Sequence, residues 1–221
     1  MLGLMMVCSV LANGVAAVLL FYELRRNQDK YAAWEEGKPP VSLVVYSVCM
    51  IVLAIGISVF VYSFYRDNTF LFTLKRGILL ALLWPIAYTD FSAMRIPNLF
   101  IVSGLAARGI VLAAELMFVR ADLVSTILTE VAASVILFLV ALLCALVAKN
   151  SIGGGDMKLF VVMGLFLGLQ GTWGAMFLSL IVSFVIAVVL LATKKKSRKD
   201  VIPFGPALMI GTYLSVFLTG M

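Results

Sequence analysis

Long apolar runs without a charged side chain are the feature that most restricts what this chain can fold into. Residues 1–21 contain no charge, and about 20 such residues suffice to cross the hydrocarbon core of a bilayer. Similar runs recur along the chain, of which 63% of residues are hydrophobic and only 13% charged. A soluble domain has roughly 45–50% apolar and about 25% charged residues. The sequence therefore predicts an all-α integral membrane protein.

The apolar runs predict a polytopic helical bundle of about eight transmembrane helices, within a range of six to eight. The first run lacks the basic start and the small-residue cleavage site of a signal peptide, so we expect it to be kept as a helix. Residues 66–76 are expected to form a connector. No internal repeat or low-complexity linker is visible, so residues 1–221 are predicted to form one membrane domain. The helices are expected at residues 1–21, 41–65, 77–88, 99–119, 124–148, 159–169, 173–193 and 204–218, of which the third, sixth and eighth are short.

Lysine and arginine are concentrated in alternate loops. The loops after the first, third, fifth and seventh predicted helices contain twelve of these residues, and the other loops contain four. The positive-inside rule then places the odd-numbered loops in the cytoplasm and both termini outside. This bias also explains the net charge of +6, so we expect the lipid bilayer and not nucleic acid as the partner. The predicted location is the cytoplasmic membrane.

The inventory of reactive side chains is small. Histidine is absent, which excludes Ser-His-Asp catalysis and every histidine-based metal site. Cys8, Cys49 and Cys144 are scattered within apolar runs and form no Cys-x-x-Cys pair, so neither a zinc ribbon nor a redox pair is encoded. We therefore expect no bound metal.

A polar, glycine-rich segment interrupts the apolar pattern at residues 151–159. Its glycines, Gly153, Gly154 and Gly155, would permit positive φ values and the close approach of another segment. Asp156 follows at the expected start of the next apolar helix. A carboxyl at a membrane boundary is by default a functional hypothesis, although a helix N-cap explains Asp156 as well.

A second carboxyl, Asp90, has a similar setting on the same predicted side of the membrane. It lies just past the run 77–88, and Pro97 suits the start of the next helix. Arg95 could neutralise Asp90 in an ordinary boundary ion pair. If the two helices pack together, the carboxyls can share a site in which one is the acid and the other activates a water. Glu115 and Glu130 lack such a context and are interpreted as packing or span-end residues.

Three segments, in this order along the chain, resemble the type IV prepilin peptidases, a family of Gly-x-Gly-Asp intramembrane aspartyl proteases. Residues 153–159 are similar to the Gly-x-Gly-Asp motif and its Asp-x-Lys-Leu ending. Residues 88–98 resemble the family's first catalytic segment, and residues 202–211 resemble its last-helix signature. The matching residues are Asp90, Arg95, Ile96, Pro97, Asn98, Gly153, Gly155, Asp156, Lys158, Pro203, Phe204, Gly205, Pro206 and Gly211.

The resemblance implies an aspartyl endopeptidase that removes a short basic leader, after a glycine, from type IV pilin-like precursors at the cytoplasmic face. Asp90 and Asp156 would hold and activate the water, and Gly153 and Gly155 would bring the carboxyls together. The segment 203–206 would support the site or grip the substrate. Lys158 would bias the ionisation of Asp156 or mark the membrane interface. Proteolysis would need no cofactor.

The chain differs from the larger bacterial members of this family. Their cytoplasmic domain with two Cys-x-x-Cys pairs is replaced by residues 23–40, which contain no cysteine. Many members also N-methylate the new amino terminus, and S-adenosylmethionine would be a cofactor only if that activity is retained. Two alternatives stay open: an ion- or proton-coupled transporter, because paired membrane carboxyls and glycine-broken helices also describe ion pathways, and a non-catalytic pilus-assembly scaffold. The oligomeric state is not predicted.

Overall fold

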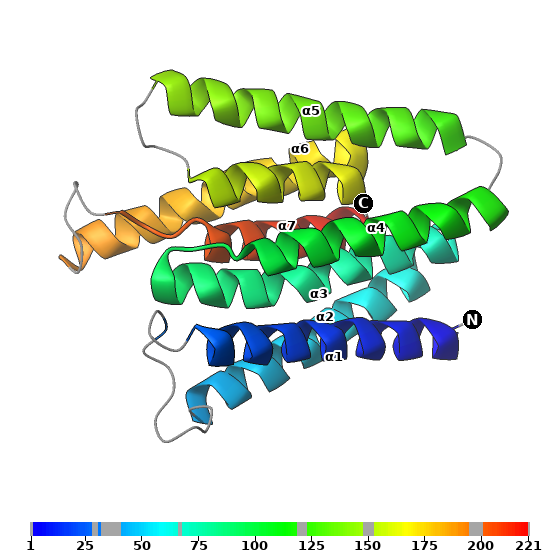
Figure 1. Cartoon of the computed structure of the whole chain (residues 1–221), viewed down its shortest axis with the longest axis horizontal. Coiled ribbons are helices and arrows are strands. Elements are labelled where there is room, and N and C mark those ends of the chain that lie inside the picture. The colour runs from blue at the N-terminus through cyan, green and yellow to red at the C-terminus, as the bar shows by residue number, and fades with distance from the viewer. Residues whose placement is uncertain are drawn as a thin grey trace.

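The structure is a computed structural model that describes residues 2–27, 31, 41–65, 68–118, 123–147, 153–194 and 201–220. Within these residues the secondary structure is entirely helical (Figure 1). Six helices are long and apolar enough to cross a membrane, and a seventh apolar helix is shorter. The predicted polytopic helical membrane fold is therefore confirmed. The helices are α1 (Leu2–Arg26), α2 (Val41–Phe64), α3 (Phe70–Ala93), α4 (Asn98–Phe118), α5 (Leu123–Val147), α6 (Gly154–Ala192) and α7 (Gly205–Thr219).

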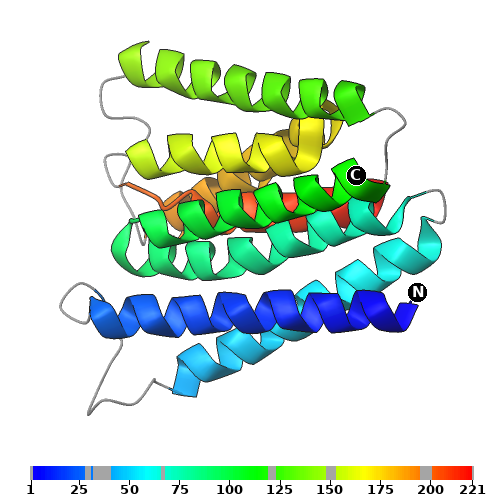
Figure 2. The same ribbon diagram turned by 45° about the vertical axis from the view of Figure 1, so that its right-hand side comes forward.

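Helix α6 reverses its direction at Gly168. This residue has φ 65° and ψ −174°, a backbone conformation that is open essentially to glycine alone. In Figures 1 and 2 the first half of α6 and the second half run in opposite directions. Met176 and Leu180 of the second half accordingly line the same groove as Phe160 of the first half. The two halves correspond to the separate runs expected at 159–169 and 173–193, so the described helices make eight passes.

Helix α3 is longer than the sequence indicated, and the expected connector at 66–76 is wrong in its second half. The helix begins at Phe70, after Thr69, whose hydroxyl accepts the Phe72 N–H at 3.3 Å. It includes Lys75 because this charged side chain is buried against carboxylates of other helices. The helix also ends later than expected, at Ala93, so Asp90 lies inside its last turn and not just past its end.

Helix α3 is the centre of the bundle and packs against α1, α2, α4, α6 and α7. The Tyr213 hydroxyl of α7 donates to the Leu80 carbonyl of α3 at 2.8 Å, and Tyr46 of α2 donates to the Trp84 carbonyl at 3.0 Å. The first bond holds α7 alongside α3, and the second links α2 to α3. As a result, the first turn of α7 lies beside the last turn of α3.

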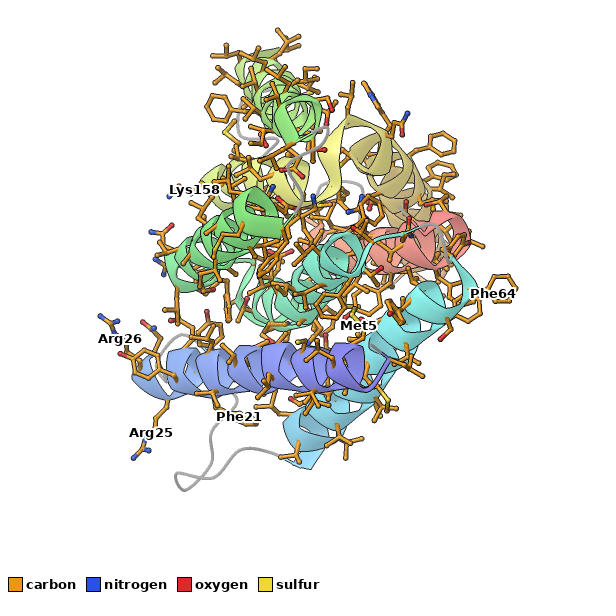
Figure 3. The ribbon with its side chains drawn as sticks, turned by 90° about the vertical axis from the view of Figure 1, so that its right-hand side faces the viewer. Met5, Phe21, Arg25, Arg26, Phe64 and Lys158 are labelled. Atoms are coloured by element: carbon orange, nitrogen blue, oxygen red, sulfur yellow. The ribbon has the colours of Figure 1, made fainter. Side chains whose placement is uncertain are left out.

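The two chain ends lie at one end of the bundle, and the starts of α4, α6 and α7 lie at the other (Figures 1 and 2). Figure 3 shows Arg25, Arg26 and Lys158 along one side of the molecule and Phe64 on the opposite side. This arrangement agrees with the alternation of the basic loops. Most of the basic loop at 194–199 lies outside the described residues.

Candidate active site

A polar cavity of about 590 Å³ opens where α1 and α3 end and where α4 and α6 begin. Asp90 and Asp156 both line it, although they come from different helices. The structure thus brings the two predicted carboxyls to one site. The other residues of the cavity wall are Glu23, Arg26, Asn27, Tyr31, Met94, Arg95, Ile96, Pro97, Asn98, Leu99, Gly153, Gly154, Gly155 and Lys158.

Asp90 is bound to the start of α7. Its side chain is buried, and its Oδ2 atom accepts the Gly205 N–H at 2.7 Å. The Phe204 N–H also donates to this carboxyl. The first N–H groups of a helix have no partner within the helix and carry a partial positive charge. The N-terminus of α7 is therefore a fitting site for the Asp90 carboxylate.

The segment 203–206 supports this contact sterically. A Cβ atom at Gly205 would lie 2.9 Å from both Cβ and Oδ2 of Asp90, closer than side chains normally approach. Pro206 occupies the first turn of α7, where its missing N–H is not needed. Phe204 packs edge-on against Phe160 of α6, with ring centroids 6.1 Å apart. This segment therefore contacts Asp90 and supports its position.

Asp156 is the third residue of α6. Gly153 is the N-cap, and its N–H donates to the Asp156 carboxyl, as in a capping box. The Oδ1 atom is buried and has no hydrogen-bond partner within the described residues. The Asp90 charge acts on Asp156, so the two carboxyls repel each other. Asp156 can therefore serve both predicted roles. One of its oxygens caps the helix by accepting the Gly153 N–H, and Oδ1 remains available to the site.

The glycines before Asp156 allow close packing but do not use positive φ. The described glycines with positive φ are Gly168 and Gly220. A Cβ atom at Gly155 would lie 3.0 Å from the Cβ of Ile96, and one at Gly153 would lie 3.1 Å from Oδ2 of Asp156. Gly155 therefore lets the start of α6 approach the segment that follows α3.

The basic residues of the motifs do not pair with the two carboxyls. Lys158 donates from Nζ to Oδ1 of Asn98 at 2.9 Å, which links α6 to the start of α4. Arg95 makes no ion pair with Asp90, and the ion pairs of the described residues all involve Lys75 or Arg108. The boundary ion pair considered for Asp90 is thus not formed.

The segment after α1 contributes residues that the sequence analysis did not single out. Tyr31 is 2% exposed, and its hydroxyl has no partner within the described part of the chain. Burial, with the nearby Glu23 charge, raises the pKa of Tyr31 to about 12, so the hydroxyl stays protonated and can donate into the cavity. The sequence feature that could have indicated Tyr31 is its position in the loop after the first helix, which is predicted to lie on the same side of the membrane as Asp90 and Asp156.

The geometry suits proton transfer to and from a bound water. Asp90 accepts the Gly205 and Phe204 amides, and Asp156 accepts the Gly153 amide through one oxygen and has no hydrogen-bond partner at the other within the described residues. Both line a cavity of about 590 Å³, which is large enough for several waters. Among the described residues no group of three or more His, Cys, Asp or Glu side chains is arranged to hold a metal ion.

Comparison with known proteins agrees with this geometry. Residues 77–192, which include Asp90 and Asp156, match the type IV leader peptidase family. The prepilin leader peptidase/N-methyltransferase of Bacillus subtilis is 30% identical over 141 residues, which are 62% of this chain and 53% of the relative. The protein of the same name from Legionella pneumophila is 29% identical over 161 residues, 71% of this chain and 55% of the relative.

A third relative with this name, from Xanthomonas campestris, is 35% identical over 72 residues, 33% of this chain and 25% of the relative. No solved structure matches the chain. The chain spans about half the length of the first two relatives. On the family match, the chain belongs to the type IV leader peptidase family.

Proposed function

We propose that this protein is a membrane aspartyl endopeptidase that removes the short basic leader, after a glycine, from type IV pilin-like precursors. The observation that carries the proposal is that Asp90 and Asp156, from two helices, line one polar cavity. Membership of the leader peptidase family supports the reaction. The aspartic mechanism rests on this pair of carboxyls and on a sequence without histidine.

The proposed mechanism uses the mutual repulsion of the two carboxyls. Two carboxyls in one site cannot both ionise easily, so one holds a proton while the other is charged. The charged carboxylate takes a proton from a water as the water oxygen attacks the scissile carbonyl carbon. The protonated carboxyl gives its proton to the carbonyl oxygen. The carboxyl that took the water proton then gives it to the leaving nitrogen as the C–N bond breaks. The other carboxylate takes a proton from a hydroxyl of the tetrahedral intermediate as the carbonyl re-forms, so the pair returns to its singly protonated state.

An apolar groove next to Asp156 supports a substrate with a hydrophobic helix. The groove has a volume of about 440 Å³, lies between α5 and the two halves of α6, and extends to Asp156 and Phe204. Phe160, Met176 and Leu180 give it an apolar surface. We propose that the hydrophobic segment after the cut lies here, with the polar leader in the cavity of Asp90 and Asp156. The cavity would then face the cytoplasm, where the basic loops are expected.

The proposal covers proteolysis without a cofactor. N-methylation with S-adenosylmethionine is a separate activity, which the two carboxyls do not address. The peptidase reaction is therefore the activity to be tested.

The test is cleavage of a pilin-like precursor by the purified protein in detergent. Asp90→Asn and Asp156→Asn should each lower the rate by at least about 10³-fold, because an amide cannot exchange the required proton. The double variant should lose little more than either single variant, since the carboxyls act as one unit. Asp67→Asn and Asp122→Asn, chosen from the sequence as controls, should retain activity.

One result would reject the proposal. If Asp156→Asn, shown to be folded and inserted, cleaves the precursor at nearly the wild-type rate, the carboxyls are not catalytic. The transporter or scaffold function would then be favoured.

A further inference from the structure

Five charged side chains are buried together near the end of the bundle opposite Asp90 and Asp156. They come from α3, α4 and α5, and none is more than 6% exposed. At 1.5 Å per residue they lie about 20 Å along α3 from Asp90, so the proposed peptidase site does not use them. The five residues are Lys75, Arg76, Arg108, Glu115 and Glu130.

Four of these side chains compensate one another. Lys75 pairs with Glu130 and, at 3.4 Å, with Glu115. Arg108 pairs with Glu130 and, at 2.9 Å, with Glu115. Arg108 also donates to the Leu165 carbonyl of α6 at 2.9 Å. Two cations and two carboxylates thus form a closed network that holds α3, α4, α5 and α6 together.

Arg76 is the charge that this network leaves over. It is 4% exposed, forms no ion pair within the described residues, and its Nε atom has no hydrogen-bond partner there. The guanidinium lies 3.3 Å from the centroid of the Phe72 ring and makes one long hydrogen bond, 3.4 Å, to the Phe72 carbonyl. Glu130 and Glu115 also attract Arg76, but the five residues carry three positive and two negative charges. One buried positive charge is therefore uncompensated within the described residues, which is strongly unfavourable. Arg76 therefore points to an anion that completes its surroundings.

A cavity beside Arg76 has room for such an anion. Its volume is about 460 Å³, and Lys75, Arg76 and Gln170, which carry hydrogen-bond donors, line its wall. The wall also contains residues 169–171, where the second half of α6 begins after the bend, and a helix N-terminus favours an anion. Glu130 lines the cavity too, but both of its oxygens are engaged by Lys75 and Arg108.

We propose that this cavity binds a phosphate-bearing anion, with Arg76 as its main ligand. The anion is either the headgroup of a phospholipid or free phosphate, since a guanidinium binds both through the same oxygens. In the predicted orientation the cavity faces the outer leaflet. The proposal is independent of the peptidase function.

The experiment measures thermal unfolding of the purified protein in a phosphate-free sugar detergent. Sodium phosphate is compared with sodium chloride at equal ionic strength, and a short-chain phosphatidylglycerol with a diacylglycerol of the same chain length. At least one phosphate-bearing probe should raise the midpoint by about 2 °C or more, because ligands that bind only the folded state stabilise it. Arg76→Gln should lose this shift. Arg25→Gln, at the end of α1 and outside this cavity, should retain it.

The outcomes separate the two sources. A shift with phosphate alone assigns free phosphate, and a shift with the phospholipid only assigns the headgroup. No shift with either probe, or an equal shift in Arg76→Gln, overturns the proposal. The proposal is also overturned if phosphate raises the unfolding midpoint only in Asp67→Asn or Asp122→Asn and not in the wild type. A carboxylate of the chain itself would then be the partner of Arg76.

A second pair of variants applies if Arg76→Gln does not fold. Arg76→Lys keeps the charge but loses the planar group of donors, and Gln170→Leu removes a donor from an exposed residue of the cavity wall. Both should reduce the shift. A full shift in both variants would overturn the proposal.

Discussion

The carboxyls of the candidate site are held by backbone amides at the starts of two helices. Gly205 and Phe204 donate to Asp90, and Gly153 donates to Asp156. A Cβ atom at Gly205 would lie 2.9 Å from Asp90, and one at Gly153 would lie 3.1 Å from Oδ2 of Asp156. The geometry of the site should therefore depend on particular glycines more than on the basic residues that accompany them in the motifs.

Replacing the closely packed glycines should impair cleavage, and replacing their neighbour should not. Gly205→Ala and Gly155→Ala each place a Cβ atom 2.9–3.0 Å from another side chain, so Asp90 or the start of α6 must shift. We expect at least a tenfold fall in the cleavage rate, since a displacement of about 1 Å can cost 10²-fold. Gly154→Ala meets nothing within 4 Å and serves as the matched control. Equal rates for all three variants, measured on folded protein, would contradict this role for the glycines.

Removal of metal ions should leave cleavage unchanged. The sequence contains no histidine and no paired cysteines, and these are the usual ligands of transition metals. The measurement is the cleavage rate before and after treatment with EDTA, with a zinc-restored sample as the control. Activity that is lost in EDTA and returns with zinc would replace the two-carboxyl mechanism by a metal-assisted one.

At the scale of the helices, small residues set how closely neighbouring helices pack. A Cβ atom at Gly164 of α6 would lie 2.5 Å from the backbone nitrogen of Ser134 in α5. Gly211 of α7 is in similarly close contact with Ser179 in the second half of α6. In a membrane, such contacts replace the hydrophobic drive to association. The position of α7 against α6, and with it the support of Asp90, therefore depends on Gly211.

Gly164→Ala should destabilise the bundle. The added methyl group meets backbone atoms that cannot rotate away, and overpacking of this kind typically costs about 1–3 kcal/mol. Gly109→Ala in α4 meets nothing within 4 Å and should be neutral or slightly stabilising, because alanine has the higher helix propensity. The free energy of unfolding in mixed micelles measures both. If Gly164→Ala and Gly109→Ala have the same free energy of unfolding, the close contact between α5 and α6 does not contribute to stability.

The helices were largely predictable, because hydropathy reports burial in lipid residue by residue. A break between the two apolar runs was expected at residues 170–172, but the chain bends at Gly168, inside the first run, and residues 170–172 are helical. Gly168 carried no signal that distinguished it from other glycines. The start of α3 was missed because Lys75 and Arg76 counted as loop residues. The burial of Lys75 depends on Glu130, which is distant in the sequence, and local patterns do not contain such a pairing.

The candidate site was predictable to the extent that its residues lie in short motifs. Asp90 and Asp156 were identified from their glycine and proline contexts, and the structure places them at one cavity. The bond from Gly205 to Asp90 and the presence of Tyr31 in the wall depend on how α7 and the segment after α1 pack on α3. Tertiary contacts of this kind have no counterpart in local sequence.

The whole molecule is polar at two opposite ends. The cavity of Asp90 and Asp156 lies at the end where α1 and α3 finish, and the cluster around Arg76 lies near the other end. Arg25, Arg26 and Lys158 share the side of the first cavity (Figure 3). If that side is cytoplasmic, the cavity of the two carboxyls is where a basic leader would be presented.

The orientation can be tested at the basic loop of residues 194–199. Its five cationic side chains should each gain about 1 kcal/mol near an anionic inner leaflet, so the loop should face the cytoplasm. In a variant without Cys8, Cys49 and Cys144, Ser197→Cys should react with an impermeant thiol reagent only after the membrane is breached. Leu2→Cys, at the opposite end of the bundle, should react in intact cells. The reverse pattern would turn the molecule over and place Asp90 and Asp156 at the outer face, where a leader held in the cytoplasm could not reach them.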